Sequence, residues 1–196
     1  TVRKILADRQ GRTWFCMTGS AEAEAVALCS DGISFWGVDA TQVGFNSVNS
    51  LCEDREGGLW FGTWGGGLTR FDPSGPFVLG RADGQPFSQV ARVAEDRDHR
   101  LWMQFSDLMV ENRQWPVGYV EAGQFTTVAD TVGYQMDLQF TDDGATWMAG
   151  RQGLARWCDD RLQTVIDTAA SGSVLFSVTC LARDRQGRLL LARRNR

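Results

Sequence analysis

The glycine-rich stretch GTWGGG, residues 62–67, could form a phosphate-binding loop. Glycine-rich loops hold phosphates where they lead into a helix, because the helix N-terminus supplies aligned N–H groups. No helical periodicity follows Gly67, and the next residues, LTRFD, have the pattern of a strand. We therefore predict a tight turn between two strands rather than a nucleotide site.

Catalysis would need proton-transfer groups or a nucleophile, and the sequence offers few. His99 is the single histidine, and in DRDHRLW it stands where related segments have glycine. Histidine tolerates positive φ better than most residues, so a turn role is predicted for it. The pairs Glu22/Glu24 and Asp142/Asp143 are close in sequence, whereas a glycosidase needs two opposed carboxylates at a set separation. We expect no enzyme, with a lyase or hydrolase as the minor alternative.

Metal and redox chemistry have little support. The chain has five cysteines, an odd number without a CxxC pair, which disfavours a zinc site or a disulfide framework. Cys16 and Cys29 could meet across neighbouring strands, but buried free thiols are the prediction. We expect no metal and no cofactor.

Composition narrows the class of protein. The net charge of −4 over 196 residues argues against nucleic acid as a partner, and no apolar run is long enough to span a membrane. With 22 Gly, 8 Trp and 11 Phe but only 4 Pro, the chain favours a turn-rich all-β protein packed by aromatic side chains.

A repeat organises the whole chain. Five segments share the pattern D-x-x-G-x-x-W, and their last residues are 46, 42, 45 and 43 positions apart. A period of about 44 residues with short strands is typical of propeller blades. The five copies are DRQGRTW (8–14), DREGGLW (54–60), DRDHRLW (96–102), TDDGATW (141–147) and DRQGRLL (184–190).

Each repeat is predicted to form four short antiparallel strands, A to D. Strand A carries V-x-x-[IL], the D-x-x-G turn follows, and strand B carries the Trp. The fold class is therefore all-β, a single β-propeller domain over 1–196 with about 4.5 repeats. The last repeat stops after strand B, so we expect part of a larger ring, a trimmed ring, or a blade completed by another copy. The predicted repeats are 1–40, 41–84, 85–130, 131–170 and 171–196.

Residues 48–72, VNSLCEDREGGLWFGTWGGGLTRFD, resemble the two-component regulator propeller repeat, roughly V-x-x-I-x-x-D-x-x-G-x-[IL]-W-[IF]-G-T-x-x-G-G-[IL]-x-[RK]-[FY]. Repeats one and three depart from this pattern after the Trp, and repeat four keeps a weaker form. The resemblance implies a β-propeller sensor region, of the kind that precedes hybrid histidine kinases and related regulators. It also implies an extracytoplasmic location, periplasmic or secreted, and the binding of glycans or other ligands.

The ligand is expected on the loop face, the side of the propeller where the B–C and D–A connections lie. The longest B–C segments, 18–27 and 105–116, depart most from the repeat and contain Glu22, Glu24, Asp107 and Asn112, for which solvated surface loops are the alternative to ligand binding. Trp64, in a B–C turn, is expected to be partly exposed and to stack on a sugar, with packing on the next blade as the alternative. The predicted ligand-binding residues are Thr63, Trp64, Trp115, Asn46, Asn49, Arg113, Glu111, Arg151 and Gln152.

Arginines recur in the A–B turns, which lie on the opposite side, here called the turn face. Pairing with the Asp of the same turn is predicted for them, with a rim for anions or proteins as the alternative. Two hypotheses of function follow. The first is a non-catalytic recognition domain for a small molecule or glycan, and the second is an assembly module that self-associates through its incomplete blade.

Overall fold

The protein is described here from a computed structural model. The described residues are 2–17, 26–39, 47–71, 77–79, 89–105, 116–121, 124–129, 137–150, 153–167 and 177–194. All regular elements within these segments are β-strands. The predicted all-β fold is confirmed.

The strands form four four-stranded sheets and one hairpin, and each strand pairs antiparallel with its neighbours in the chain. We call the sheets blades 1 to 4 and the hairpin blade 5. Blade 1 contains β1 (Val2–Ala7), β2 (Thr13–Met17), β3 (Ala27–Ser30) and β4 (Phe35–Val38). Blade 2 contains β5 (Val48–Glu53), β6 (Leu59–Thr63), β7 (Leu68–Phe71) and β8 (Phe77–Leu79).

Blade 3 contains β9 (Val90–Glu95), β10 (Leu101–Phe105), β11 (Val117–Glu121) and β12 (Gln124–Ala129). Blade 4 contains β13 (Asp137–Phe140), β14 (Thr146–Gly150), β15 (Gly153–Cys158) and β16 (Arg161–Asp167). Blade 5 contains β17 (Ser177–Arg183) and β18 (Leu189–Arg194).

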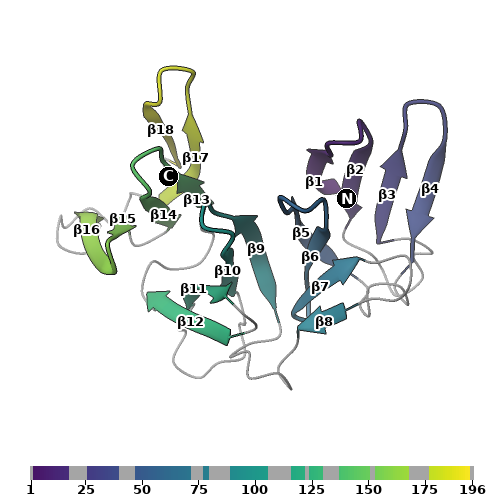
Figure 1. Cartoon of the computed structure of the whole chain (residues 1–196). Coiled ribbons are helices and arrows are strands. Elements are labelled where there is room, and N and C mark those ends of the chain that lie inside the picture. Colours follow the sequence, from purple (N-terminus) through teal and green to yellow (C-terminus); the bar gives the residue numbers. More distant parts are fainter. Residues whose placement is uncertain are drawn as a thin grey trace.

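The blades are arranged around a common centre. The first strands of consecutive blades contact one another, from β1 through β5, β9 and β13 to β17. Figure 1 shows these strands on the inner side, with β4, β8, β12 and β16 farther out. This radial order is the arrangement of a β-propeller.

A repeated hydrogen-bond network shapes the A–B turn of a blade. In blade 1, Asp8 Oδ1 accepts the backbone N–H groups of Gln10 and Arg12, at 3.0 and 2.8 Å. Asp8 Oδ2 accepts Arg12 Nε at 2.6 Å and the indole N–H of Trp14 at 2.8 Å. Asp96 makes the same four kinds of bond in blade 3. The Asp of the motif therefore closes the turn and fixes the buried Trp of the next strand.

In blades 2 and 4 the position of Arg12 and Arg100 is not an arginine, and an arginine on strand C contacts a turn carboxylate instead. In blade 2 the position holds Gly58, and a Cβ atom there would lie 2.6 Å from Asp54 Oδ2 and 2.7 Å from Arg70 Nε. Arg70 extends from β7, with Nη2 3.8 Å from the Asp54 carboxylate. In blade 4, Arg156 of β15 likewise donates to Asp143 at 2.9 Å.

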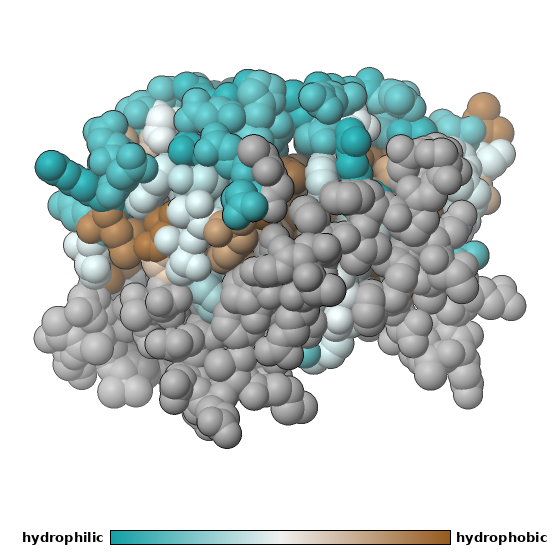
Figure 2. All heavy atoms as spheres, turned by 60° about the horizontal axis from the view of Figure 1, so that its bottom comes forward, coloured by the Kyte–Doolittle hydropathy of each residue, from teal (hydrophilic) through white to brown (hydrophobic). Residues whose placement is uncertain are grey.

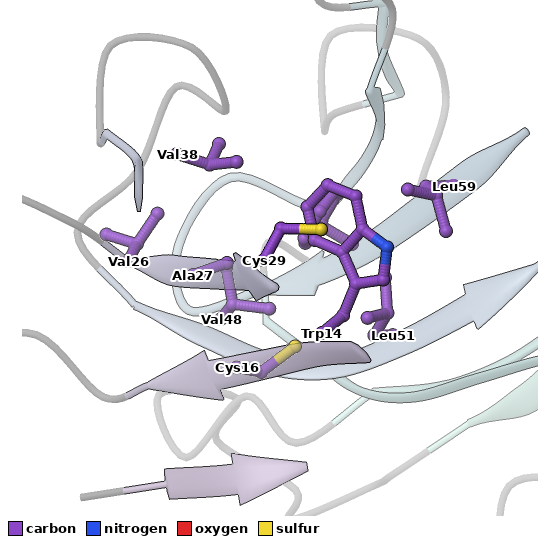
Figure 3. Packing of buried hydrophobic residues seen from close by; sticks show 10 residues of the cluster. Trp14, Cys16, Val26, Ala27, Cys29, Val38, Val48, Leu51 and Leu59 are labelled. Carbon is purple, nitrogen blue, oxygen red and sulfur yellow. The ribbon is translucent and has the colours of Figure 1, made fainter. Parts of the chain in front are cut away.

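The core lies in the seams between consecutive blades. At the first seam, Trp14 and Cys29 of blade 1 pack against Val48, Leu51 and Phe61 of blade 2. Figure 3 shows Cys29, Val48 and Leu51 gathered around Trp14. The next seams repeat this arrangement around Trp60 and Trp102. Each seam therefore joins the Trp-bearing face of one blade to the V-x-x-[IL] face of the following blade.

Candidate functional site

The structure describes only part of the predicted ligand-binding set. Thr63, Trp64 and Asn49 lie within the described residues. The other candidates fall outside them, and so do the long segments with Glu22, Glu24, Asp107 and Asn112. The undescribed site residues are Asn46, Glu111, Arg113, Trp115, Arg151 and Gln152.

Trp64 lies on the loop face, between blades 2 and 3. It follows the end of β6, and its backbone N–H donates to the carbonyl of Ser47 at 3.0 Å. It also forms an isolated antiparallel bridge with Gln89, directly before β9. The backbone is thus held from two sides, while the side chain is 46% exposed, as the sequence predicted.

Thr63 shapes the turn beneath Trp64. Its side chain is buried, and Oγ1 donates to the carbonyl of Gly67 at 2.9 Å and accepts the N–H of Gly66 at 3.1 Å. Gly65 and Gly67 have φ angles of 102° and 77°, which favour glycine. The predicted tight turn between two strands is confirmed, and no helix follows it in the described segment 47–71.

Polar groups gather in the seam next to Trp64. Asn49 on β5 is partly buried, with Nδ2 3.5 Å from the carbonyl of Val90. Ser50 and Gln89 are at least nine-tenths buried, yet Ser50 Oγ and Gln89 Oε1 have no hydrogen-bond partner among the described residues. Unsatisfied buried polar atoms cost free energy and are uncommon in folded proteins. Gln89 is also the residue whose backbone bridges to Trp64, so these two atoms single out this seam.

The sequence did not point to Ser50 or Gln89. Ser50 lies inside strand A, at a position that carries no motif residue. The residue paired with it on β6 is Gly62, which has no side chain, so the Ser50 hydroxyl can lie close to the β6 backbone. A Cβ atom on Gly62 would lie 2.3 Å from Ser50 Oγ and 2.8 Å from Val90 Cγ1. The one feature of the sequence that could have indicated Gln89 is its position directly before a strand A, in a D–A connection of the loop face.

The groups weighed for catalysis serve other purposes. His99 has φ 63° in its turn, as predicted, and its ring lies 3.0 Å from Glu95 Oε1 and 2.9 Å from Arg55 Nη1. Asp142 bonds to Arg97 and Arg183, and the latter contact lowers its pKa. The hydroxyl of Thr141 and the guanidinium of Arg156 lower the pKa of Asp143 to about 2. These groups are engaged on the turn face, away from Trp64.

Six of the turn-face arginines divide into two sets. Arg12, Arg100 and Arg188 pair with the Asp of their own turn, at 2.6 to 2.8 Å, as predicted. Arg9, Arg55 and Arg97 instead reach the next blade, and this was not predicted. Their guanidinium groups donate to the backbone carbonyls of Arg55, Asp96 and Asp142 at 2.6, 3.2 and 2.8 Å. Figure 2 shows the resulting hydrophilic band along the top of the molecule.

The two buried cysteines of blade 1 are free thiols. Cys16 and Cys29 are both fully buried in the first seam (Figure 3). Burial raises the pKa of Cys16 to about 12, so this thiol is inert at neutral pH. Within the described part of the chain, no three His, Cys, Asp or Glu side chains come together as metal ligands would.

Residues 42–65 match the protein family described as two component regulator propeller. The chain carries a repeat of that family. No curated protein sequence matches it. Over the described residues, no helix is long and apolar enough to cross a membrane.

Solved structures share the propeller fold. The extracellular domain of a protein described as the hybrid two component system BT3049 from B. thetaiotaomicron matches 97% of this chain, with TM-score 0.74 and 17% identity. The extracellular domain of BT4673 from the same organism, described as a one component system, matches 98%, with TM-score 0.73 and 16% identity. This chain spans 26% of each of those chains.

An enzyme has the same fold. The virginiamycin B lyase from Staphylococcus aureus matches 95% of this chain, which covers 61% of the lyase, with TM-score 0.68 and 14% identity. At these identities the likeness shows the β-propeller architecture and nothing about the site.

Proposed function

We propose that this chain is part of a non-catalytic, sensor-type β-propeller that binds a small molecule or glycan on its loop face. The observation that carries the proposal is the exposed indole of Trp64, held at the seam of blades 2 and 3 beside polar groups. An indole offers a flat apolar surface for a sugar ring, while nearby amides fix the orientation of hydroxyl groups.

Each described residue of the seam has a separate role in this proposal. Trp64 is the stacking platform, and Thr63 supports it by closing the turn below. Asn49 and Gln89 provide amide groups at the edge of the platform, where ligand hydroxyls would replace weak or missing hydrogen bonds. The six undescribed candidates on neighbouring loops remain predicted members of the same surface.

The sensor class and the location rest on similarity. Two solved structures with this fold are extracellular domains of one- and two-component systems, and residues 42–65 match a regulator propeller family. We therefore place this chain outside the cytoplasm and in a signalling protein, as a proposal. No nucleic acid partner is proposed, since the net charge is −4.

Catalysis is not proposed, despite the lyase with the same fold. One structure of that lyase is described as catalytically inactive after a histidine-to-alanine change. The present chain has one histidine, His99, and its ring contacts Glu95 and Arg55 on the turn face.

The test is binding to an array of neutral and uronic-acid oligosaccharides, followed by calorimetry with the strongest binder. Trp64→Ala should weaken binding at least about fivefold, because an aromatic contact contributes about 1 kcal/mol beyond area burial and 1.4 kcal/mol is a factor of ten. The matched control is Trp36→Ala on β4, since Trp36 is 40% exposed but lies outside the Trp64 seam. Equal binding by wild type and the Trp64 variant would reject the proposed site.

A further inference from the structure

His99 links blades 2 and 3 on the turn face. Its Nε2 atom lies 2.9 Å from Nη1 of Arg55, in the A–B turn of blade 2, and its Nδ1 atom lies 3.0 Å from Oε1 of Glu95, at the end of β9. The other carboxylate oxygen of Glu95 accepts the backbone N–H of Arg55 at 2.8 Å, and Arg55 Nη2 donates to the carbonyl of Asp96 at 3.2 Å. The ring is therefore part of a closed set of hydrogen bonds that joins the two blades.

The partners of His99 determine which ring nitrogen carries the proton. An arginine guanidinium has donors and no acceptor, so Nε2 must be the unprotonated nitrogen that accepts from Arg55. An ionised carboxylate only accepts, so Nδ1 must carry the proton that is donated to Glu95. Neutral His99 satisfies both contacts. A protonated imidazole donates from both nitrogens and can satisfy only the contact with Glu95.

The first seam has the same link without a histidine. The backbone N–H of Arg9 donates to Glu53 Oε2 at 3.0 Å, and Arg9 Nη1 donates to the carbonyl of Arg55 at 2.6 Å. Gly57 takes the place of His99 in the turn of blade 2, and the other four repeats all have glycine at this position, with φ angles between 79° and 86°. The imidazole of blade 3 is therefore an addition to the link, and the turn does not require it.

The remaining charged groups of the two turns are each engaged with a group other than His99. They are Asp96 and Asp98 with Arg100, Arg97 with Asp142, Asp54 and Glu56 with Arg70, and Glu53 with the backbone of Arg9. Both turns lie wholly within the described residues. The ring of His99 thus faces one anion, Glu95 of its own blade, and one cation, Arg55 of blade 2.

We propose that His99 is a pH-sensitive latch between blades 2 and 3. The neutral ring holds Arg55 across the seam. The His99 side chain is 56% exposed, so water can supply a proton to Nε2 as the pH falls through the range in which histidine side chains titrate. Protonated Nε2 cannot accept from Arg55, and two cations then face each other at hydrogen-bond distance, so Arg55 is released from the ring.

Protonation changes the partner of His99 more than it changes the total stability. The ion pair that protonated His99 forms with Glu95 lies within blade 3, and it offsets the hydrogen bond lost to blade 2. The Arg55–His99 contact itself contributes above the titration range of histidine and is lost as the pH falls through that range. The latch acts on the seam that carries Trp64 on its opposite side, and it operates with or without a ligand.

A double-mutant cycle on the full 196-residue chain measures this contact. The variants are Arg55→Ala, His99→Gly and the two together, with urea unfolding at low salt at about pH 8 and about pH 5. At the higher pH, Arg55→Ala should cause a larger loss of stability in the chain with His99 than in the His99→Gly chain. At the lower pH, the two losses should be equal or reversed in order. Arg9→Ala is the matched control, because its turn partner carries glycine, and its loss should not depend on pH or on His99.

Nitrogen NMR of the wild type provides a second readout that needs no variant. His99 is the single histidine of the chain, so its ring gives the only imidazole signals. Above the titration range, the proton of the neutral ring should be on Nδ1. A proton on Nε2 of the neutral ring, equal losses at the higher pH, or a difference between the losses that persists unchanged at the lower pH would overturn the proposal.

Discussion

Replacement of Asp8 by alanine tests the turn network most directly. Asp8 accepts four hydrogen bonds, and its side chain is fully buried. Burial raises the pKa of Asp8, but the hydrogen bonds from Trp14 and Arg12 outweigh it, so the net shift of the pKa is downward. The carboxylate is therefore the form that stabilises the blade.

The size of the effect follows from where each donor lies. The backbone N–H groups of Gln10 and Arg12 are in a surface turn, and water can replace the lost acceptor at little cost. The Trp14 indole N–H is buried, and leaving such a donor unsatisfied costs about 1–3 kcal/mol. Loss of the partly buried Arg12 pair adds about 1 kcal/mol. We expect Asp8→Ala to reduce the free energy of unfolding by about 2–4 kcal/mol.

Asp184→Ala is the matched control. Asp184 accepts the same two turn N–H groups and an arginine Nε, but Leu190 replaces the Trp, and Arg188 is 70% exposed. This variant should lose about 1 kcal/mol or less, because exposed ion pairs contribute little. Urea unfolding followed by circular dichroism gives both values. Equal losses would refute the assignment of the larger effect to the Trp14 indole.

The remaining predictions concern acid and the seam. The lowered pKa of Asp143, about 2, means that its contribution to stability is fully present above its unfolded pKa of 3.8 and is lost as the pH falls toward 2. The urea midpoint should therefore stay level above about pH 5 and fall below about pH 4, and Asp143→Asn should make that fall shallower. Gln89→Leu removes a buried oxygen without a partner, so the free energy of unfolding should stay equal or rise, while glycan affinity falls. A large loss of stability in this variant would show that Gln89 is needed for the fold.

The division into blades could be predicted because it depends on local contacts. Asp8 and Trp14 are six residues apart in one hairpin, so the hydrogen bond between them is encoded in a short motif. His99 in a positive-φ turn and the glycine turn after Thr63 follow from the same kind of local rule. The ligand-binding set stays a prediction. Trp64 is exposed as expected, whereas the sequence did not indicate the surroundings of Ser50 and Gln89, because contacts with Val90 and Trp64 join two different repeats.

The sequence by itself determined the repeat, the four-stranded blades and the side chains that alternate between two faces. Tertiary structure decided which groups meet across a seam: Arg9 with the carbonyl of Arg55, and Trp64 with Gln89. It also decided that Ile5 is exposed while Leu51, with the same motif position, is buried. The physical reason is distance along the chain. Contacts within a hairpin are set by the turn, but contacts about 44 residues apart depend on how one blade stacks on the next.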